Sequence, residues 1–277
     1  MTRFPPVPEA LPSPVVDTHC HLDIVRHDLD LEPLPPEQAM AQAAGVGVTR
    51  IVQIGCDLPS ARWAVEASRT YSNVIGGVAL HPNDAPLQAD LDTALAEIET
   101  LASAHDKVRV IGETGLDFFR TGDDGRVKQE ESFRRHVDIA KRLGKTLQIH
   151  DRDAHQAVLD VLDSEGVPDR WVMHCFSGDA EFARACLDRG AHLSFAGTVT
   201  FKNAADLREA LLVVPRDRVL VETDAPFLTP SPHRGAPNAS YLVPLTMRVM
   251  AEVRGDDLAE LCEAVNENAE TAFGGPW

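Results

Sequence analysis

Apolar runs typical of strands alternate with stretches of helical periodicity along most of the chain. Eight runs rich in Val, Ile and Leu predict strands at 14–18, 49–54, 74–80, 107–112, 145–150, 170–174, 191–195 and 218–222. Apolar residues at helical spacing predict helices at 36–45, 59–70, 89–104, 127–143, 153–165, 179–189, 203–213, 241–254 and 256–272. Strands and helices that alternate in this way pair the strands in parallel. Eight such units predict an α/β fold, a (β/α)8 TIM barrel in a single domain.

The ends of this pattern set the expected domain limits. Residues 1–13 are rich in proline, so we expect a flexible N-terminal tail, and residues 14–277 then form the barrel. Proline and glycine are also frequent in residues 227–240, which follow the eighth predicted strand. A long loop at that position lies at the C-terminal rim of a barrel, where substrate contacts are expected.

Composition and charge narrow the class of protein. The hydrophobic fraction of 44% and the charged fraction of 25% are those of an ordinary globular protein. A net charge of −17 argues against a surface that binds polyanions generally, because phosphate contacts need clustered Lys and Arg. A nucleic-acid substrate is compatible with this charge if bound metal ions and a few local arginines make the contact.

The cysteines and the hydropathy suggest where the protein works. Five cysteines without C-x-x-C spacing are typical of a reducing compartment, and no targeting or membrane-spanning segment is evident, so we expect a cytoplasmic protein. Cys20 and Cys175 each adjoin a histidine, and strand alternation predicts that both face the helical layer. The amphipathic helices leave no obvious unpaired apolar face, which favours a monomer without an obligate protein partner.

Six residues that can ligate a metal stand at the ends of the strand-like runs: His19, His21, Glu113, His150, His174 and Asp224. Strand ends that share one rim of a parallel barrel converge, so ligands far apart in the sequence can meet at one site. The other histidines, which lack such a context, are expected to be solvent-facing or structural: His27, His105, His136, His155, His192 and His233. The pattern predicts a metal-dependent hydrolase.

The types of ligand fit this chemistry. His19 and His21 are two residues apart in an extended segment, so both imidazoles point the same way and can hold one ion. The Glu113 carboxylate can bridge two cations with one oxygen each. Asp224 can ligate a metal and hold the attacking water.

The motifs that carry these residues are similar to those of a known family. The series DTHCHLD, GETGLD, IHDRDA, HCFSG and ETDAP, followed by RG-x-x-N, resembles the TatD family of metal-dependent deoxyribonucleases, within the amidohydrolase-like barrels. The resemblance covers nearly the whole chain. It implies that His19, His21, Glu113 and Asp224 hold one metal and that Glu113, His150 and His174 hold a second.

The same resemblance suggests residues that bind the substrate. Arg234 and Asn238 match the mouth-loop pattern of the family and can contact a phosphate. His81 ends the third strand, where the family usually shows HPH, but Asn83 replaces the second histidine here. We therefore expect His81, Arg234 and Asn238 to contact the substrate.

These observations predict cleavage of phosphodiester bonds in DNA by a deoxyribonuclease, an exonuclease that works through two divalent metal ions, Zn²⁺, Mn²⁺ or Mg²⁺. Glu113 and Asp224 are the expected catalytic residues. The alternative is hydrolysis of a small carboxyl ester, lactone, amide or aminoacyl ester. A non-catalytic metal-binding protein is a third interpretation.

Overall fold

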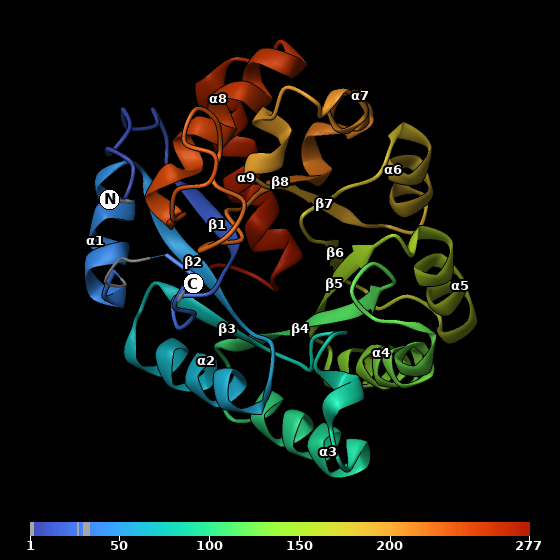
Figure 1. Ribbon diagram of the computed structural model, residues 1–277. Coiled ribbons are helices and arrows are strands. Elements are labelled where there is room, and N and C mark those ends of the chain that lie inside the picture. Colours follow the sequence, from blue (N-terminus) through green and yellow to red (C-terminus); the bar gives the residue numbers. More distant parts are fainter. Residues whose placement is uncertain (1–2, 27, 30–33) are drawn as a thin grey trace.

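The computed structural model describes residues 3–26, 28–29 and 34–277, which form one barrel of parallel strands surrounded by helices (Figure 1). The strands pair in the order of the sequence: β1 (Val15–Cys20), β2 (Val48–Gly55), β3 (Val74–Val78), β4 (Val108–Asp117), β5 (Thr146–Arg152), β6 (Trp171–Met173), β7 (His192–Phe195) and β8 (Val219–Val221). The helices are α1 (Pro36–Gly45), α2 (Leu58–Thr70), α3 (Leu91–Ala102), α4 (Asp123–Leu143), α5 (His155–Glu165), α6 (Ala180–Leu187), α7 (Ala205–Val213), α8 (Val243–Arg254) and α9 (Leu258–Ala272). The predicted TIM barrel is confirmed.

The first and last strands meet at their C-terminal ends. The backbone N–H of Asp224 donates to the carbonyl of His19 at 2.9 Å, and Cys20 forms a parallel bridge with Ala225. The Thr18 hydroxyl also donates to the carbonyl of Val221 at 2.9 Å. This closure brings β1 and β8, which carry three of the predicted ligands at or just beyond their ends, to the same part of the rim.

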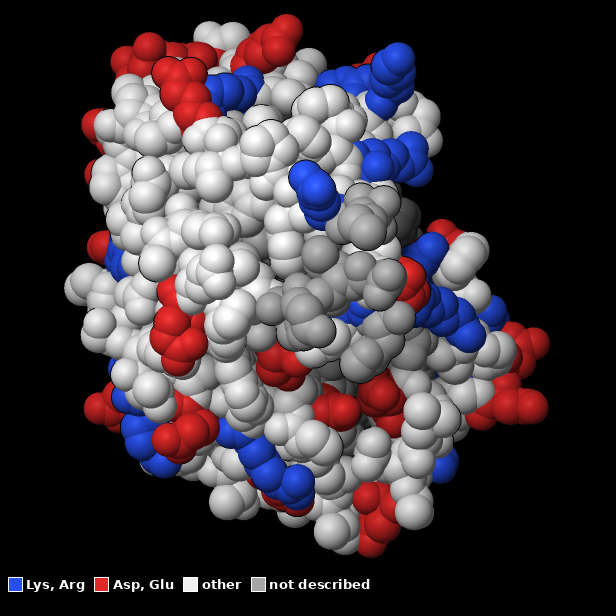
Figure 2. All heavy atoms as spheres, turned by 60° about the vertical axis from the view of Figure 1, so that its left-hand side comes forward, with Lys and Arg blue, Asp and Glu red and all other residues white. Residues whose placement is uncertain are grey.

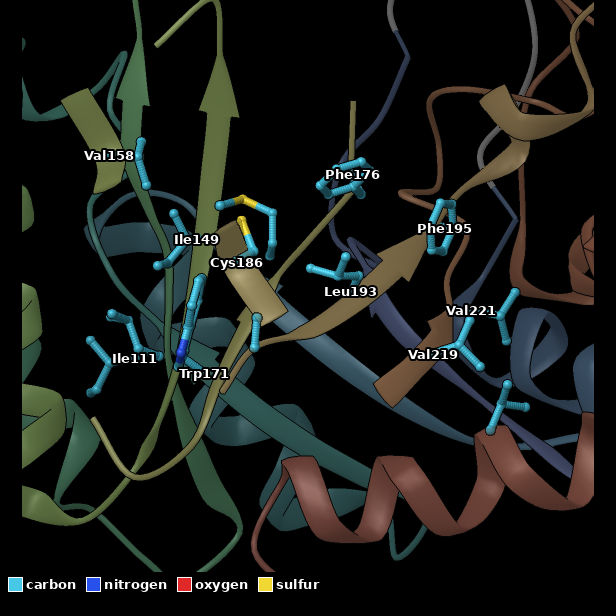
Figure 3. Packing of buried hydrophobic residues seen from close by; sticks show 14 of the residues in the cluster. Ile111, Ile149, Val158, Trp171, Phe176, Cys186, Leu193, Phe195, Val219 and Val221 are labelled. Atoms are coloured by element: carbon cyan, nitrogen blue, oxygen red, sulfur yellow. The ribbon is translucent and has the colours of Figure 1, made fainter. Parts of the chain in front are cut away.

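Alternation along the strands divides their apolar side chains between two cores. One set fills the interior of the barrel: Val16, Val52, Ile54, Ile75, Val110, Val172 and Leu220. The other set faces outward and packs against the helices. Figure 3 shows part of this outer core, in which Ile149 and Trp171 of neighbouring strands lie near Val158 and Cys186 of the surrounding helices. Burial on both faces explains the nearly continuous apolar runs.

The helices begin and end where local chemistry allows. The Asp57 carboxylate accepts a hydrogen bond from the backbone N–H of Ser60, and the Ser60 hydroxyl accepts one from the backbone N–H of Asp57, which forms a capping box on α2. Gly144 ends α4 with φ +61°, in the left-handed region, as the sequence predicts.

The C-terminal segment closes the bottom of the barrel. Ala269, Ala272 and Phe273 join the interior apolar cluster. The Arg109 guanidinium, on β4, donates to the carbonyl of Gly275 at 2.7 Å, and the Thr146 hydroxyl, on β5, donates to Ala272 at 2.6 Å. The opposite, C-terminal end of the strands is therefore the end that is left for a functional site.

The N-terminal segment lies against the barrel. The Tyr241 hydroxyl donates to the carbonyl of Pro5 at 2.6 Å, Arg248 donates to Ala10 at 3.1 Å, and Leu11 is buried. The flexibility predicted for residues 1–13 stays a prediction, but the described part of this segment has defined partners.

The fourth strand differs from the prediction. It was expected to stop at residue 112, just before Glu113, but β4 continues to Asp117. Its pairing with β5 shifts register between Ile111 and Thr114, and Glu113 lies within this irregularity. Gly115 follows with φ +142°, and a Cβ there would collide with the His150 carbonyl oxygen, so only glycine fits. The bulge lets the strand carry Glu113 inward without ending.

Charged residues are spread over the face of the molecule that Figure 2 shows. On the face in Figure 2, basic side chains stand in small groups near acidic ones, around a broad uncharged area. No helix within the described ranges has the length and apolar character needed to cross a membrane.

Candidate metal centre

The six predicted ligands converge at the C-terminal rim of the barrel. Four of them form one set of donor atoms. His19 Nε2 lies 3.2 Å from His21 Nε2 and 3.5 Å from Glu113 Oε2. Asp224 Oδ1 lies 3.7 Å from His19 Nε2 and 3.5 Å from His21 Nε2. Donor atoms that surround one Zn²⁺ at about 2.1 Å stand about 3.4 Å apart in tetrahedral geometry, so this set fits a single cation.

The second oxygen of Glu113 faces a different group of histidines. Glu113 Oε1 lies 2.8 Å from His174 Nε2, 2.6 Å from His150 Nδ1 and 3.4 Å from His81 Nε2. His81 was predicted to bind substrate, but its ring nitrogen, Glu113 and His150 form a group whose donor atoms lie within 4.8 Å of one another and could hold a metal ion. The two oxygens of one buried carboxylate therefore serve two adjacent donor sets.

Hydrogen bonds to Nδ1 orient the two histidine rings of the first set, so that their Nε2 atoms face the other donor atoms. Gln148 donates through Nε2 to the carbonyl of Thr18 at 2.9 Å, which turns its Oε1 toward His19 Nδ1 at 3.1 Å. His21 Nδ1 donates to the carbonyl of Ile54 at 2.8 Å. In both His19 and His21, a proton on Nδ1 leaves the lone pair of Nε2 free. Metal-binding histidines use this arrangement.

Carboxylates orient the other two rings. His174 Nδ1 lies 3.1 Å from Glu222 Oε1, which also accepts the backbone N–H of Cys175 at 2.8 Å. Asp117 Oδ2 lies 3.3 Å from His150 Nε2. The Glu222 side chain is fully buried, so this pair is withdrawn from solvent.

Electrostatics keep the central carboxylates ionised. Burial would raise the pKa of Glu113, but neighbouring His174 and His81 lower it well below its ordinary value. Burial would likewise raise the pKa of Asp224, and hydrogen bonding to His21 with the charge of His19 lowers it. Cations would find deprotonated oxygen ligands at this centre at neutral pH.

A buried carboxyl supports the segment that carries Asp224. Asp17 accepts from the backbone N–H of Thr223 at 2.9 Å and from its hydroxyl at 2.6 Å. Burial raises the pKa of Asp17 to about 6, although the hydrogen bonds from Thr223 lower it. Asp17 thus ties β1 to the residue before Asp224 and does not itself face the donor sets.

Two of the residues predicted to contact the substrate, Arg234 and Asn238, lie in the loop of residues 227–240, and their surroundings differ from each other. The Arg234 guanidinium lies 4.5 Å from the centroid of the Phe201 ring and is exposed. Asn238 is buried, and its amide donates to the carbonyls of Thr223 at 2.9 Å and Phe227 at 2.6 Å. Asn238 therefore holds the loop in place, and substrate contacts by both residues stay predictions.

Sequence reasoning missed four residues around the ligands: Cys56, Asp117, Gln148 and Glu222. The Cys56 thiol lies 3.7 Å from Glu113 Oε2 and 3.8 Å from His21 Nδ1. It follows β2 directly, and Glu222 follows β8, so their positions at strand ends were the available signal. Gln148 precedes His150 by two residues, on the same side of β5.

The prediction for the two cysteines next to histidines is confirmed for Cys20, but its premise does not hold for Cys175. Cys20 is buried in an apolar cluster with Met40 and Ile51. Cys175 is half-buried and has φ +43°, outside the extended geometry on which the prediction relied. Strand β6 ends at Met173, so alternation no longer applies there.

Among the other histidines, His136 has a structural role. It is buried on α4, where its Nε2 accepts the backbone N–H of Leu80 at 3.2 Å and its Nδ1 donates to Ser132 at 2.7 Å. Burial lowers the pKa of His136 to about 4, so the ring is neutral. His27 lies outside the described residues.

Known proteins are similar to this chain in both fold and sequence. The family model described as TatD related DNase matches residues 16–274. An uncharacterized metal-dependent hydrolase TatD of Mycobacterium tuberculosis is 45% identical over 95% of this chain and 99% of its own length, and YabD of Bacillus subtilis is 39% identical over 93% and 98%. The crystal structure of YJJV, a TatD homolog from Escherichia coli K12, is similar with a TM-score of 0.84 at 27% identity, over 95% of this chain and 98% of that one.

The barrel, the rim of histidines and carboxylates, and these relatives define the class as metal-dependent hydrolases. Within that class, the chain belongs to the TatD family.

Proposed function

We propose that this protein is a deoxyribonuclease, an exonuclease that hydrolyses phosphodiester bonds in DNA at a centre of two divalent cations. The observation that carries the proposal is the division of Glu113, whose Oε2 faces His19 and His21 while its Oε1 faces His150 and His174. A paired centre of this kind suits in-line displacement at phosphorus. The family model, described as TatD related DNase, supports the same reaction.

The cations, bound as Zn²⁺, Mn²⁺ or Mg²⁺, would supply Lewis-acid activation of the phosphodiester and of a water. Glu113 fixes the distance between the two donor sets. The Asp224 side chain is 16% exposed, whereas that of Glu113 is 5% exposed, so Asp224 is the carboxylate that an incoming water can reach. Asp224 orients that water and accepts its proton, and Arg234 contacts the phosphate.

The test is cleavage of end-labelled single-stranded DNA by metal-stripped protein, with Mg²⁺, Mn²⁺ and Zn²⁺ returned separately. The expected result is a ladder that shortens from one end and is lost in His150→Ala, which also excludes a contaminating nuclease. Absence of cleavage with every metal would overturn the proposal.

One observation favours a second candidate, hydrolysis of a small carboxyl ester or lactone. A small cleft of about 80 Å³ reaches His21 and is lined by apolar side chains that include Leu22, Ile24, Pro226 and Pro237. Such a cleft can take an apolar acyl group beside the metal centre. Esters with acyl chains of increasing length, tested beside DNA, distinguish the candidates, because only an acyl-binding cleft gives rates that rise with chain length.

A further inference from the structure

An exposed aromatic ring and an arginine form a pair at the mouth of the barrel. The Arg152 guanidinium lies 3.9 Å from the centroid of the Phe119 ring. Phe119 is 62% exposed, although its neighbour Phe118 packs against the core beneath Arg126. Arg152 covers one face of the Phe119 ring, and the exposure of the side chain leaves flat aromatic surface open to solvent beside the metal centre.

The register of the sheet places this pair at the edge of the metal centre. Asp117 of β4 pairs with Arg152 of β5, and Asp117 Oδ2 lies 3.3 Å from His150 Nε2. Arg152 follows His150 by two residues and Phe119 follows Asp117 by two. The pair therefore stands just outside the groups at the centre, with Arg152 at the end of β5 and Phe119 two residues past the end of β4.

The charge of Arg152 is available to a ligand. Arg26, which also lies near an aromatic ring at the rim, is neutralised by Asp28, with Nη2 2.5 Å from Oδ2. Arg152 forms no salt bridge with a carboxylate in the described ranges, and stacking on Phe119 leaves the edge donors of its guanidinium open. In a chain with a net charge of −17, an unneutralised arginine beside the centre is a local anion site.

We propose that Phe119 and Arg152 form a nucleotide subsite, in which a nucleobase stacks on the open face of Phe119 and the adjoining phosphate binds Arg152. This inference rests on the proposed nuclease function and specifies its substrate as a strand with unpaired bases, because a base held in a duplex cannot reach the ring. Aromatic platforms next to basic groups are the general means of binding single strands without sequence preference.

The experiment compares oligothymidylate with an abasic phosphodiester oligomer of equal length. Phe119→Ala should lower kcat/KM about tenfold on oligothymidylate, the size expected for one lost stack, and leave the abasic oligomer unchanged. Phe119→Tyr should restore the wild-type rate. Arg152→Ala should slow both oligomers by a similar factor, because both contain the phosphate. Leu212→Ala, which removes an exposed apolar side chain on α7, is the matched control.

Two results separate failure of this subsite from failure of the nuclease function. If the wild type cleaves oligothymidylate and Phe119→Ala affects both oligomers equally or neither, the subsite is overturned and the nuclease stands. If the wild type cleaves neither, anisotropy of labelled oligothymidylate with metal-free protein decides. A tenfold weaker Kd in Phe119→Ala, specific to the oligomer with bases, supports the subsite, and equal Kd values overturn it.

Discussion

Glu222 and His174 form a buried pair in which the carboxylate oxygen Oε1 lies 3.1 Å from the imidazole Nδ1. The same oxygen accepts the N–H of Cys175, so the carboxylate fixes both the ring and the loop that follows β6. Partners of this kind hold a metal-binding histidine in the correct tautomer. The candidate centre therefore depends on residues that do not themselves face the donor sets.

Replacement of that partner should weaken metal binding. We expect Glu222→Gln to lower affinity for Zn²⁺ about 10- to 100-fold, because the neutral amide orients and polarises His174 less well. Competition with a chromophoric chelator measures the affinity, and Glu267→Gln, at an exposed position of α9, is the control. Equal affinities in Glu222→Gln and wild type would show that His174 needs no such partner.

Asp224→Asn should abolish turnover with little effect on the fold. Asparagine keeps the size of the side chain but cannot accept a proton, and loss of a general base costs about 10²- to 10⁴-fold in rate. Turnover of DNA and thermal unfolding would be measured together, beside Asp206→Asn on the outer surface of α7. Near-normal turnover in Asp224→Asn would remove this residue from the mechanism.

Stability should fall on acidification partly through His136. Its folded pKa of about 4 lies below the ordinary value of 6.5, so between these values the unfolded chain binds a proton that the folded protein does not. The stability it contributes is present above pH 6.5 and is lost as the pH falls toward 4. Between pH 7 and 4.5 this loss is about 2 kcal/mol.

Urea unfolding of wild type and His136→Gln at several pH values measures the effect. The wild type should lose about 2 kcal/mol more than the variant between pH 7 and 4.5. The second buried histidine with a pKa of about 4, His192, is present in both proteins and cancels in the comparison. Parallel stability curves would mean that His136 does not titrate in this way.

Gly115→Ala should damage the barrel at the metal centre. The Cβ would meet the His150 carbonyl oxygen at a φ of +142°, and we expect a loss of about 3 kcal/mol. That corresponds to a fall in Tm of about 5 °C, measurable by calorimetry. Gly122→Ala, where a Cβ would meet nothing within 4 Å, should leave Tm nearly unchanged. Equal Tm values for the two variants would contradict the steric argument.

The order of strands and helices was predictable because each strand is buried on both faces and each helix on one. The metal ligands could also be predicted from the sequence, because they stand at the ends of strands and a parallel barrel brings those ends together. The extension of β4 could not, because the register shift beside Glu113 depends on contacts with β5 that periodicity does not encode.

The side chains that orient the ligands could not be predicted from the sequence either. Gln148 and Glu222 act across the barrel on histidines of other strands, so no local spacing relates them. Asn238 matched a motif, but its amide is used by loop carbonyls that only the folded loop brings near. The alternation from which the face of Cys175 was predicted ends at this residue, because its φ is positive.

The most direct test of this account is the number of metal ions held by Glu113. Protein equilibrated with Mn²⁺ and freed of excess metal would be analysed by inductively coupled plasma mass spectrometry, together with Glu113→Gln. Because one carboxylate serves both donor sets, the wild type should contain about two ions per chain and Glu113→Gln about one, with hydrolysis lost. One ion in the wild type, or two in both proteins, would contradict a centre built around a shared carboxylate.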